Sequence, residues 1–248
     1  MRYTDVFKRY EFKYLLTGEE KELLLDAMKD HMQIDEYGRT IIRNIYYDTP
    51  DMRLIRTSLD RPVYKEKLRV RSYSKVTGSD PVFIEIKKKY DGIVYKRRIA
   101  VPEHQATDWL SGEADKPFDS QIANEIEYMR SYYRDLRPAC FLSYEREAYK
   151  DLSGGDLRIT TDHNILARTD RMSLKREVGG TAVIGKDLTL LEIKTADAYP
   201  MWLLRFLTDN KISKTSFSKY GEFYKTVIFP EMTGKIKATE EKGGLLYA

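Results

Sequence analysis

The chain has 248 residues, 42% of them hydrophobic and 33% charged, which is typical of a soluble globular protein with one large domain rather than of a membrane protein. Its 43 lysines and arginines nearly balance its 39 acidic residues, so the net charge of +4 by itself indicates neither a nucleic acid nor a membrane as the partner. The single cysteine, Cys140, excludes an internal disulfide. The three widely separated histidines lack the spacing of a zinc site, so any metal must rely mainly on carboxylates.

Seven segments alternate with a period of two residues, which is the pattern of a β-strand with two different faces. The predicted strands are, in chain order, residues 9–15, 63–73, 82–89, 94–101, 141–149, 156–162 and 189–195. Each strand carries charged residues on one face. The second strand shows this most strongly, because Lys65, Lys67, Arg69 and Arg71 fall in one register.

Helical segments lie between these strands. Residues 18–32 begin with glutamates in the first turn and carry Leu24 and Met28 on an apolar face, which predicts an amphipathic helix. Further helices are predicted at 102–109, with Pro102 in its first position, and at 119–136, 199–207 and 218–229, the last of them ended by Pro230. We expect a single domain over residues 1–232, followed by a polar, loosely ordered tail over 233–248.

Runs of strands with helices inserted between them favour an α+β fold over alternating βαβ units. A charged face on one strand is usually a solvated one, but here it recurs on most strands. Cations about 7 Å apart along a strand repel one another unless counter-ions or a ligand offset their charge. Closing the sheet would gather these cations in a pore, so we expect an antiparallel β-barrel, forming a tunnel with flanking helices, that attracts polyanions.

Three glutamates precede a lysine by two positions, in the pairs Glu11 and Lys13, Glu85 and Lys87, and Glu192 and Lys194. Both members of such a pair point the same way from a strand. An ionised glutamate binds Mg²⁺ or Mn²⁺ through oxygen, while the neighbouring lysine contacts a phosphate oxygen. A ladder of ion pairs is the commoner explanation for one such pair, but three of them, two in nearly identical strings, favour a site.

Eight short strings occur in a specific order along the chain. They are Arg9-Tyr-Glu-Phe-Lys-Tyr14, Asn44-Ile-Tyr-Tyr-Asp48, Lys67-Leu-Arg-Val-Arg71, Phe83-Ile-Glu-Ile-Lys87, Tyr144-Glu-Arg146, Leu157-Arg-Ile-Thr160, Leu191-Glu-Ile-Lys194 and Ser216-Phe-Ser-Lys-Tyr220. Together they resemble the catalytic domain of the eukaryotic vacuolar transporter chaperone (VTC) polyphosphate polymerase, within the triphosphate tunnel metalloenzyme (CYTH-like) superfamily. The resemblance runs from about Tyr10 to Phe229 and so covers nearly the whole chain.

The resemblance implies a basic tunnel that binds ATP with Mn²⁺ or Mg²⁺ and passes the γ-phosphoryl group to the end of a polyphosphate chain. The residues expected to act in catalysis are Lys13, Arg69, Arg71, Lys87, Arg146 and Arg158. Those expected to bind phosphate are Lys67, Lys96, Arg98, Tyr144, Lys194, Ser218 and Lys219, of which Lys67 and Lys194 come from the strand pattern alone. Glu192 matches the family's metal-binding carboxylate, and the glutamate–lysine pairs add Glu11 and Glu85 as metal candidates.

Two positions depart from the pattern of these relatives. Hydrolytic members of the superfamily are expected to open with E-x-E-x-K, but Arg9 replaces the first glutamate here, which favours the polymerase branch. Near the end of the chain the eukaryotic domains resemble K-x-S-K, and Ser216 stands at the position of the first lysine of this motif. The resemblance therefore does not imply that phosphate contact here.

Three alternative functions stay open. In a tunnel triphosphatase that hydrolyses tripolyphosphate or a nucleoside triphosphate, water needs a base or a metal, and the candidates are Glu11 and Glu85. A non-catalytic polyphosphate-binding module would not need the full set of carboxylates. Nucleic-acid binding ranks last, because the tyrosines form no obvious stacking platform. Without a secretory signal or an apolar run of roughly 20 residues, we expect a cytoplasmic protein with no membrane span, and a separate membrane partner stays open.

Overall fold

A nine-stranded antiparallel sheet organises the fold in the computed structural model, which describes residues 10–91 and 93–234. The spatial order of the strands is β1-β9-β7-β6-β2-β3-β4-β5, and the short β8 pairs with β7. Their bounds are β1 Tyr10–Leu16, β2 Met32–Asp48, β3 Tyr64–Ser72, β4 Pro81–Tyr90, β5 Ile93–Pro102, β6 Arg137–Asp151, β7 Arg158–Arg168, β8 Thr181–Ala182 and β9 Thr189–Thr195.

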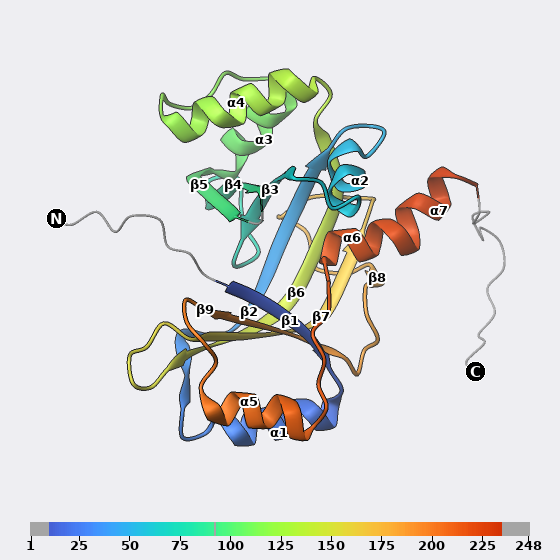
Figure 1. Ribbon diagram of the computed structural model, residues 1–248. Coiled ribbons are helices and arrows are strands. Elements are labelled where there is room, and N and C mark those ends of the chain that lie inside the picture. Colours follow the sequence, from blue (N-terminus) through green and yellow to red (C-terminus); the bar gives the residue numbers. More distant parts are fainter. Residues whose placement is uncertain (1–9, 92, 235–248) are drawn as a thin grey trace.

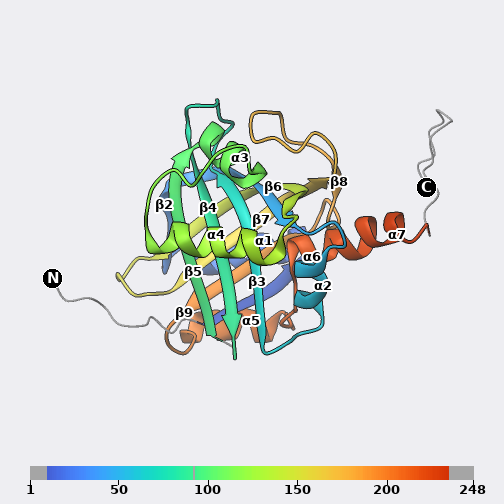
Figure 2. The same ribbon diagram turned by 90° about the horizontal axis from the view of Figure 1, so that it is seen from above.

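The sheet is strongly curved but open. The long strands β2 and β6 connect the end that holds β1 and β9 with the end that holds β3, β4 and β5, as Figure 1 shows. Seen from above, β1 and β9 lie beneath β3–β5 (Figure 2). The edge strands β1 and β5 do not pair with each other in the described residues, so the closed barrel expected from the sequence is not confirmed. The β5 edge carries Lys96, Arg97 and Arg98 in succession, and charges of this kind discourage strand pairing at an edge.

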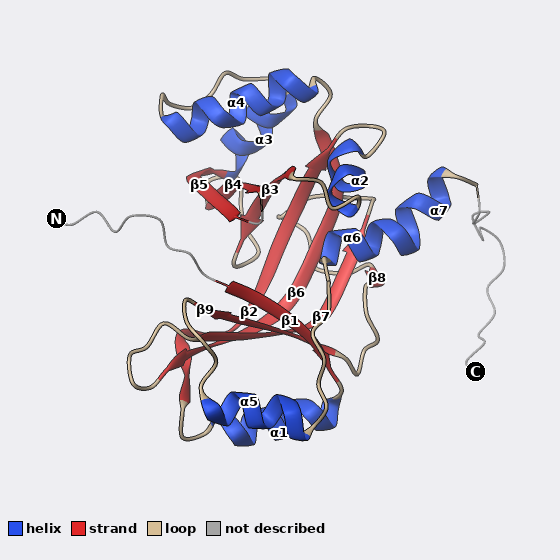
Figure 3. Ribbon diagram, viewed as in Figure 1, coloured by secondary structure: helices blue, strands red, loops and turns tan. Residues whose placement is uncertain are grey.

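Some of the helices cover the convex face of the sheet at its two ends, and others lie at its concave side (Figures 1 and 3). Their bounds are α1 Gly18–Met28, α2 Arg53–Leu59, α3 Glu103–Ser111, α4 Gln121–Tyr133, α5 Met201–Asp209, α6 Lys219–Phe223, the π-helical turn η1 Tyr224–Ile228 and α7 Phe229–Met232. Helices α1 and α5 lie beside β1 and β9, while α3 and α4 lie over β3–β5. No helix in the described residues is long and apolar enough to span a membrane.

The convex-face cores explain why these helices sit where they do. Trp109 of α3 and Ile126 of α4 are buried in one cluster with Ile84 of β4. Leu24 of α1 and Leu203 of α5 are buried in another cluster under β9. Burying one such aliphatic side chain stabilises the fold by roughly 1.5–3 kcal/mol, so these contacts also fix the curvature of the sheet that they cover.

A third cluster fills one end of the concave side. Tyr46 of β2 stacks on Tyr220 of α6, with ring centroids 4.8 Å apart. Asp48 accepts hydrogen bonds from the backbone N–H groups of Leu54 and Ile55, and from the Tyr220 hydroxyl at 3.0 Å. Because Asp48 holds the start of α2 and the α6 tyrosine together, it determines where α6 enters the concave side.

All seven predicted strands are present, although the structure does not describe Arg9 and so the first strand starts at Tyr10. Strand β2 was not predicted. Its first half contains a register shift between Ile34 and Arg39, with Gly38 in a left-handed conformation at φ 57°. Its last residues, 42–48, are buried on both faces, so no alternation marks them in the sequence.

The helices also required corrections. The first one ends at Met28 rather than at Met32, where β2 begins, and Pro102 precedes α3 as its N-cap instead of occupying its first position. Pro230 does not end the last helix, which continues to Met232. The π-helical turn ends just before α7, so Pro230 lies in the first turn of α7, where a missing N–H costs little. The seven-residue helix α2 was not predicted, and residues 235–248 of the expected tail lie outside the described residues.

Candidate functional site

The pairing register turns the charged strand faces toward one concave surface. Strand β3 places Arg69 opposite Glu85 of β4 and Lys67 opposite Lys87. At the other end of the sheet, β6 places Arg146 opposite Asp162. The remaining cross-strand neighbours on this face are Lys96 and Arg98 on β5, Thr160 and Arg158 on β7, Glu192 and Lys194 on β9, and Lys13 and Glu11 on β1. Side chains two positions apart in a strand share a face, so every strand residue of the predicted site faces the concave side.

Glu85 is the centre of a first charge cluster. Its Oε2 lies 2.8 Å from Arg69 Nε, its Oε1 lies 3.0 Å from Lys96 Nζ, and Arg71 Nε is 3.9 Å away. The glutamate is only 1% exposed. Burial raises the pKa of Glu85, but Arg69, then Arg71 and Lys96, outweigh it and hold the pKa at about 2. Glu85 is therefore an ionised counter-ion that fixes three cations in place.

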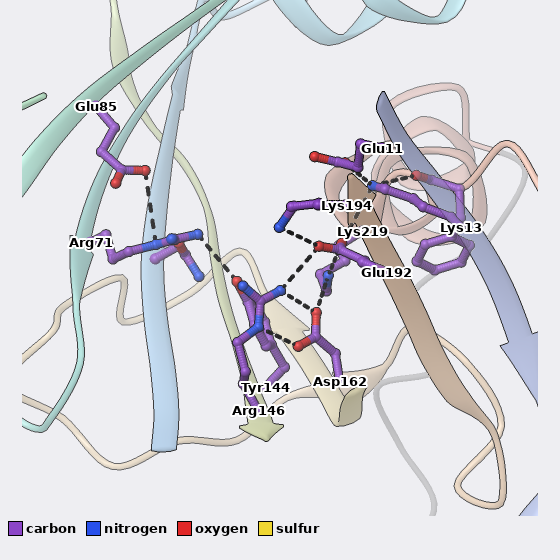
Figure 4. Close-up of polar contacts among 12 residues, drawn as sticks. Glu11, Lys13, Arg71, Glu85, Tyr144, Arg146, Asp162, Glu192, Lys194 and Lys219 are labelled. Atoms are coloured by element: carbon purple, nitrogen blue, oxygen red, sulfur yellow. Dashed lines mark hydrogen bonds and ion pairs between the residues drawn. The ribbon is translucent and has the colours of Figure 1, made fainter. Parts of the chain in front are cut away.

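Asp162 and Glu192 form a second cluster at the β7–β9 end (Figure 4). Arg146 makes a two-pronged contact with Asp162, with Nε–Oδ1 at 2.6 Å and Nη2–Oδ2 at 2.7 Å. Lys219 Nζ bridges the two acids, 2.5 Å from Asp162 Oδ2 and 3.1 Å from Glu192 Oε1. Burial raises the pKa of each acid, but neighbouring cations, Lys219 first, lower both below their usual range. Both carboxylates are thus anions in a dry setting.

Further cations contact the second cluster from the strand edges. Lys13 Nζ lies 3.5 Å from Glu192 Oε1 and 3.6 Å from Glu11 Oε1, and it donates a hydrogen bond to the Phe217 carbonyl at 3.1 Å. Lys194 Nζ lies 3.5 Å from Glu192 Oε2. Glu192 therefore contacts lysines from β1, β9 and α6 as well as Arg146. Its charge is balanced by these cations and not by solvent, because the side chain is buried.

Tyr144 connects the two clusters. Its hydroxyl accepts a hydrogen bond of 3.1 Å from Arg71 Nη2, which belongs to the first cluster. Its ring lies 5.2 Å from Arg146 Cζ and 4.5 Å from Lys219 Nζ, which belong to the second. Burial raises the pKa of Tyr144, but Arg71, Arg146 and Lys219 together lower it below the usual value of 10.0. The phenol and the three cations form one electrostatic unit across the concave face.

Lys67 and Lys87 lie between the two clusters, and among the described residues neither makes an ion pair with a carboxylate. Lys67 Nζ donates to Ser218 Oγ at 3.1 Å, and no carboxylate of the described residues lies within ion-pair distance of it. Burial lowers the pKa of Lys67 to about 7, and the charges of Lys87 and Lys13 add to this effect. Burial also lowers the pKa of Lys87, although Glu11 acts in the opposite direction. An anion placed here would relieve the repulsion.

Two predicted residues lie away from this central region. Arg158 starts on the concave face, but its Nη1 donates to the carbonyls of Gly155 and Leu157 at 3.0 and 2.9 Å, in the turn that precedes β7. Arg98 Nη1 donates to the Tyr73 hydroxyl at 3.3 Å, and its guanidinium stacks over the Phe83 ring. Both therefore line the ends of the concave face rather than its centre.

Three residues that the sequence did not assign belong to the site. Asp162 pairs with Arg146, Asn44 accepts a hydrogen bond of 3.0 Å from Arg71 Nε, and the Tyr46 hydroxyl accepts one of 3.1 Å from Arg69. Asp162 falls in register with the charged face of its predicted strand, so that pattern could have identified it. Asn44 and Tyr46 lie on β2, whose lack of alternation concealed them.

The acids of the site do not form a metal-binding cage of their own. Among the described residues, no three His, Cys, Asp or Glu side chains are close enough to hold a metal ion. Glu85 belongs to the first cluster, whereas Glu192, Asp162 and Glu11 lie around the second. A hard divalent ion bound through Glu192 would have to take most of its ligands from phosphate oxygens and water, an arrangement that suits Mg²⁺.

Comparisons with known proteins agree with the fold. Residues 8–228 match the family model of the VTC domain. A search of curated protein sequences finds no match. The crystal structure of a candidate adenylate cyclase from Bacillus halodurans is similar, with a TM-score of 0.52 and 15% identity over 84% of this chain and 92% of that chain. At this identity the likeness shows a shared fold and does not extend to activity.

Two further solved structures are more distant. A candidate adenylate cyclase from Vibrio parahaemolyticus has 12% identity and a TM-score of 0.44, over 87% of this chain and 97% of that chain. The PH1819 protein from Pyrococcus horikoshii has 14% identity and a TM-score of 0.44, over 92% of this chain and 99% of that chain.

Proposed function

The chain belongs to the VTC domain family, as the eight strings predicted, and on that premise we propose that it is a polyphosphate polymerase-like phosphotransferase. Family membership indicates a function related to triphosphates or polyphosphate. In our proposal, the concave face binds ATP or another nucleoside triphosphate together with Mn²⁺ or Mg²⁺. The γ-phosphoryl group then passes to the terminal phosphate of a polyphosphate chain.

The observation that carries this proposal is the row of cations between two internally neutralised clusters. Glu85 and the Asp162–Glu192 pair hold their arginines and lysines in fixed positions, while Lys67 has no carboxylate partner within ion-pair distance among the described residues. Arginine forks match phosphate oxygens, and a preorganised set of donors stabilises charge that develops during transfer. Phosphoryl transfer needs this positioning and neutralisation more than covalent chemistry by the protein.

The pKa values of the acids favour a phosphate over water as the nucleophile. A general base works best when its pKa lies near the operating pH. The cations around Glu85 hold its pKa at about 2, and the pKa values of Glu11, Asp162 and Glu192 also lie below their usual range. These carboxylates are poor bases for activating water. A terminal phosphate is already an anion at neutral pH and needs no base, whereas in a tunnel triphosphatase the bound metal rather than a carboxylate would have to activate the water.

In the transfer step, an oxygen of the terminal phosphate attacks the γ-phosphorus of ATP, the bond from that phosphorus to the β–γ bridging oxygen breaks, and ADP leaves. Arg69, Arg71 and Arg146 would bind the nonbridging oxygens, and Tyr144 would keep the guanidinium of Arg71 oriented. Lys67 and Lys87 would neutralise the phosphates nearest to β1. The fixed positions of these side chains reduce the reorganisation that the step requires.

A divalent ion would bind through Glu192, with Asp162 or Glu11 as its nearest acidic neighbours. When bound, Mn²⁺ or Mg²⁺ would neutralise charge on the β- and γ-phosphates. Lys219 and Lys13 contact the same carboxylate oxygen of Glu192, so their ammonium groups must move aside when a metal takes that oxygen. In this proposal the metal arrives together with the triphosphate, whose oxygens supply most of its ligands.

A non-catalytic polyphosphate-binding module is the second candidate. The observation in its favour is that each site carboxylate is already neutralised by protein cations. Such a module would bind phosphate chains tightly without consuming ATP.

The test is to incubate the purified protein with ATP and Mn²⁺ or Mg²⁺ and to separate free phosphate, ADP and long polyphosphate by electrophoresis and chromatography. We expect one ADP for each phosphate unit that is added to polyphosphate. Release of free phosphate equal to ADP would identify a triphosphatase instead. Binding of tripolyphosphate in calorimetry without any ADP would identify a binding module.

A further inference from the structure

Arg98 of the edge strand β5 stands directly opposite Glu85 in the pairing register, yet the two do not form an ion pair. Lys96, two positions earlier on the same face, contacts Glu85 instead, with its Nζ 3.0 Å from Oε1. Among the described residues, no carboxylate lies within ion-pair distance of Arg98. Its guanidinium group is thus not held by the first charge cluster, unlike those of Arg69 and Arg71.

The guanidinium group of Arg98 lies instead against two aromatic side chains. Its Cζ is 4.8 Å from the centroid of the Phe83 ring, and its Nη1 donates a hydrogen bond of 3.3 Å to the Tyr73 hydroxyl. The rings of Tyr73 and Phe83 meet edge to face, with their centroids 5.5 Å apart and an angle of 73° between their planes. Each of the three side chains therefore contacts the other two, and together they form what we call the aromatic corner.

The aromatic corner adjoins the phosphate-binding residues of the first cluster. Phe83 stands opposite Arg71 in the register, and Arg71 Cζ lies 6.0 Å from the centroid of the Tyr73 ring. Along β3, Lys67, Arg69 and Arg71 follow one another on the concave face at intervals of about 7 Å, and Tyr73 comes next, just after the strand ends. A phosphate chain that is bound along these cations would therefore end beside the corner.

The corner is open to solvent, whereas the acids of the two clusters are buried. Tyr73 is 39% exposed, and Arg98 is exposed too, while Phe83 is partly buried. A guanidinium group is flat, and it stacks on aromatic rings. One that is supported by a ring and open to solvent suits a second flat group, such as a nucleobase, better than a tetrahedral phosphate.

We propose that the aromatic corner holds the nucleobase of a nucleoside triphosphate whose phosphates lie along the concave face. The base stacks on the guanidinium group of Arg98, which Phe83 supports and the Tyr73 hydroxyl orients. This inference rests on the proposed function and deepens it, because it makes a nucleoside triphosphate the donor that the site recognises. It also gives Arg98 a contact with the base in place of the phosphate contact expected from the sequence.

Two consequences follow for the bound nucleotide. A base at this end of the concave face leaves the γ-phosphate toward the second cluster, where Arg146 and Glu192 lie. Stacking is tolerant of base identity, because every base has a π-face, so ATP and GTP should bind alike.

Binding of two ligands tests the proposal. Inorganic tripolyphosphate has no base, and an ATP analogue with an imido group in the β–γ bridge has one but resists cleavage. Arg98→Lys keeps the charge and removes the flat group, so the analogue should bind at least about fivefold more weakly, and tripolyphosphate should stay within about twofold. Phe83→Leu should shift the ratio of the two affinities in the same direction. Arg97→Lys is the matched control, because Arg97 faces the convex side and pairs with Glu125, and it should change neither affinity.

The outcomes separate this proposal from the proposed function. An equal loss of both affinities in Arg98→Lys would show that Arg98 binds phosphate, and two unchanged affinities would show that it contacts neither ligand; each result would overturn the base site. A parent protein that forms ADP and polyphosphate without any such difference refutes the base site alone. A difference that depends on the base, without turnover of ATP, supports the base site and refutes the phosphotransferase.

The triphosphate of 2-aminopurine riboside gives a second readout, because the fluorescence of this base decreases when it stacks. We expect binding to the parent to quench the fluorescence and competing tripolyphosphate to restore it. Arg98→Lys, saturated with the ligand, should quench it clearly less. Because Arg98 is exposed, this variant should fold like the parent, which thermal unfolding checks. A saturated parent whose bound base keeps its full fluorescence would reject the aromatic corner as the base site.

Discussion

Lys67 and Ser218 are 151 residues apart in the sequence, yet Lys67 Nζ donates a hydrogen bond of 3.1 Å to Ser218 Oγ. The same serine caps α6, because its Oγ accepts a hydrogen bond from the Gly221 N–H at 3.2 Å. The contact ties the middle of β3 to the residue that precedes Lys219. It therefore places a lysine with a pKa of about 7 beside the segment that supplies the central cation of the second cluster.

The first prediction follows from that pKa. A bound polyanion favours the protonated form of Lys67, so binding must take up a proton wherever the free lysine is neutral, above about pH 7. We expect the affinity for tripolyphosphate to decrease as the pH rises from about 6 to about 8, and Lys67→Arg to remove most of this decrease because arginine stays charged. Calorimetry in buffers of different ionisation enthalpy measures the proton uptake directly. The control is Lys116→Arg, which should keep the parental pH dependence of the affinity. The same dependence in Lys67→Arg would show that the proton is not taken up by Lys67.

The second prediction concerns Glu192. Replacement by Gln keeps the size of the side chain but removes its charge, so a metal ligand should lose most of the metal-dependent turnover of ATP. Binding of tripolyphosphate should persist or strengthen, because Lys219 and Lys13 lose a competing anion. Rates across a Mn²⁺ titration and calorimetry with tripolyphosphate give the two readouts. Parental turnover at every Mn²⁺ concentration would exclude Glu192 and make Glu11 or Glu85 the metal candidate.

The third prediction concerns Asp162, which neutralises Arg146 and Lys219 in the buried second cluster. Asp162→Asn leaves both cations without this charge, so we expect the free energy of unfolding to decrease by about 3–5 kcal/mol in the absence of ligand. Tripolyphosphate should restore part of this loss by supplying negative charge. Urea denaturation with and without tripolyphosphate measures both effects. Asp170→Asn, at an exposed ion pair with Arg171, should change stability far less than Asp162→Asn does, because solvent screens an exposed pair. Similar losses for the two variants would refute the role given to Asp162.

The fourth prediction concerns the hydroxyl of Tyr144. Tyr144→Phe keeps the ring between Arg146 and Lys219 but removes the acceptor for Arg71, so Arg71 should lose its fixed orientation. We expect tripolyphosphate to bind about 3- to 10-fold more weakly, in keeping with the roughly 0.5–1.5 kcal/mol that one typical hydrogen bond contributes. The matched control is Tyr46→Phe, which removes an acceptor for Arg69 but does not connect the two clusters. An equal loss in the two variants would show that the connection between the clusters has no separate effect.

Much of the candidate site could be predicted because the direction of a side chain in a strand is a local property. Alternation with a period of two put Lys67, Arg69 and Arg71 on one face of β3, and the same rule put Glu192 and Lys194 on one face of β9. The structure shows that these faces turn to a common concave side. The roles of these residues in catalysis, phosphate binding and metal binding stay predictions that the experiments above test.

The sequence by itself determined which residues of each strand share a face, because successive side chains of an extended chain must point to opposite sides. The tertiary structure alone decided which strands are neighbours, and therefore that Lys219 meets Asp162 and that Tyr144 connects two clusters. It also decided that the sheet stays open between β1 and β5 in the part of the chain that the structure describes. Such contacts join residues far apart in the chain, and the packing of helices and sheet that brings them together is a property of the whole fold rather than of any local pattern.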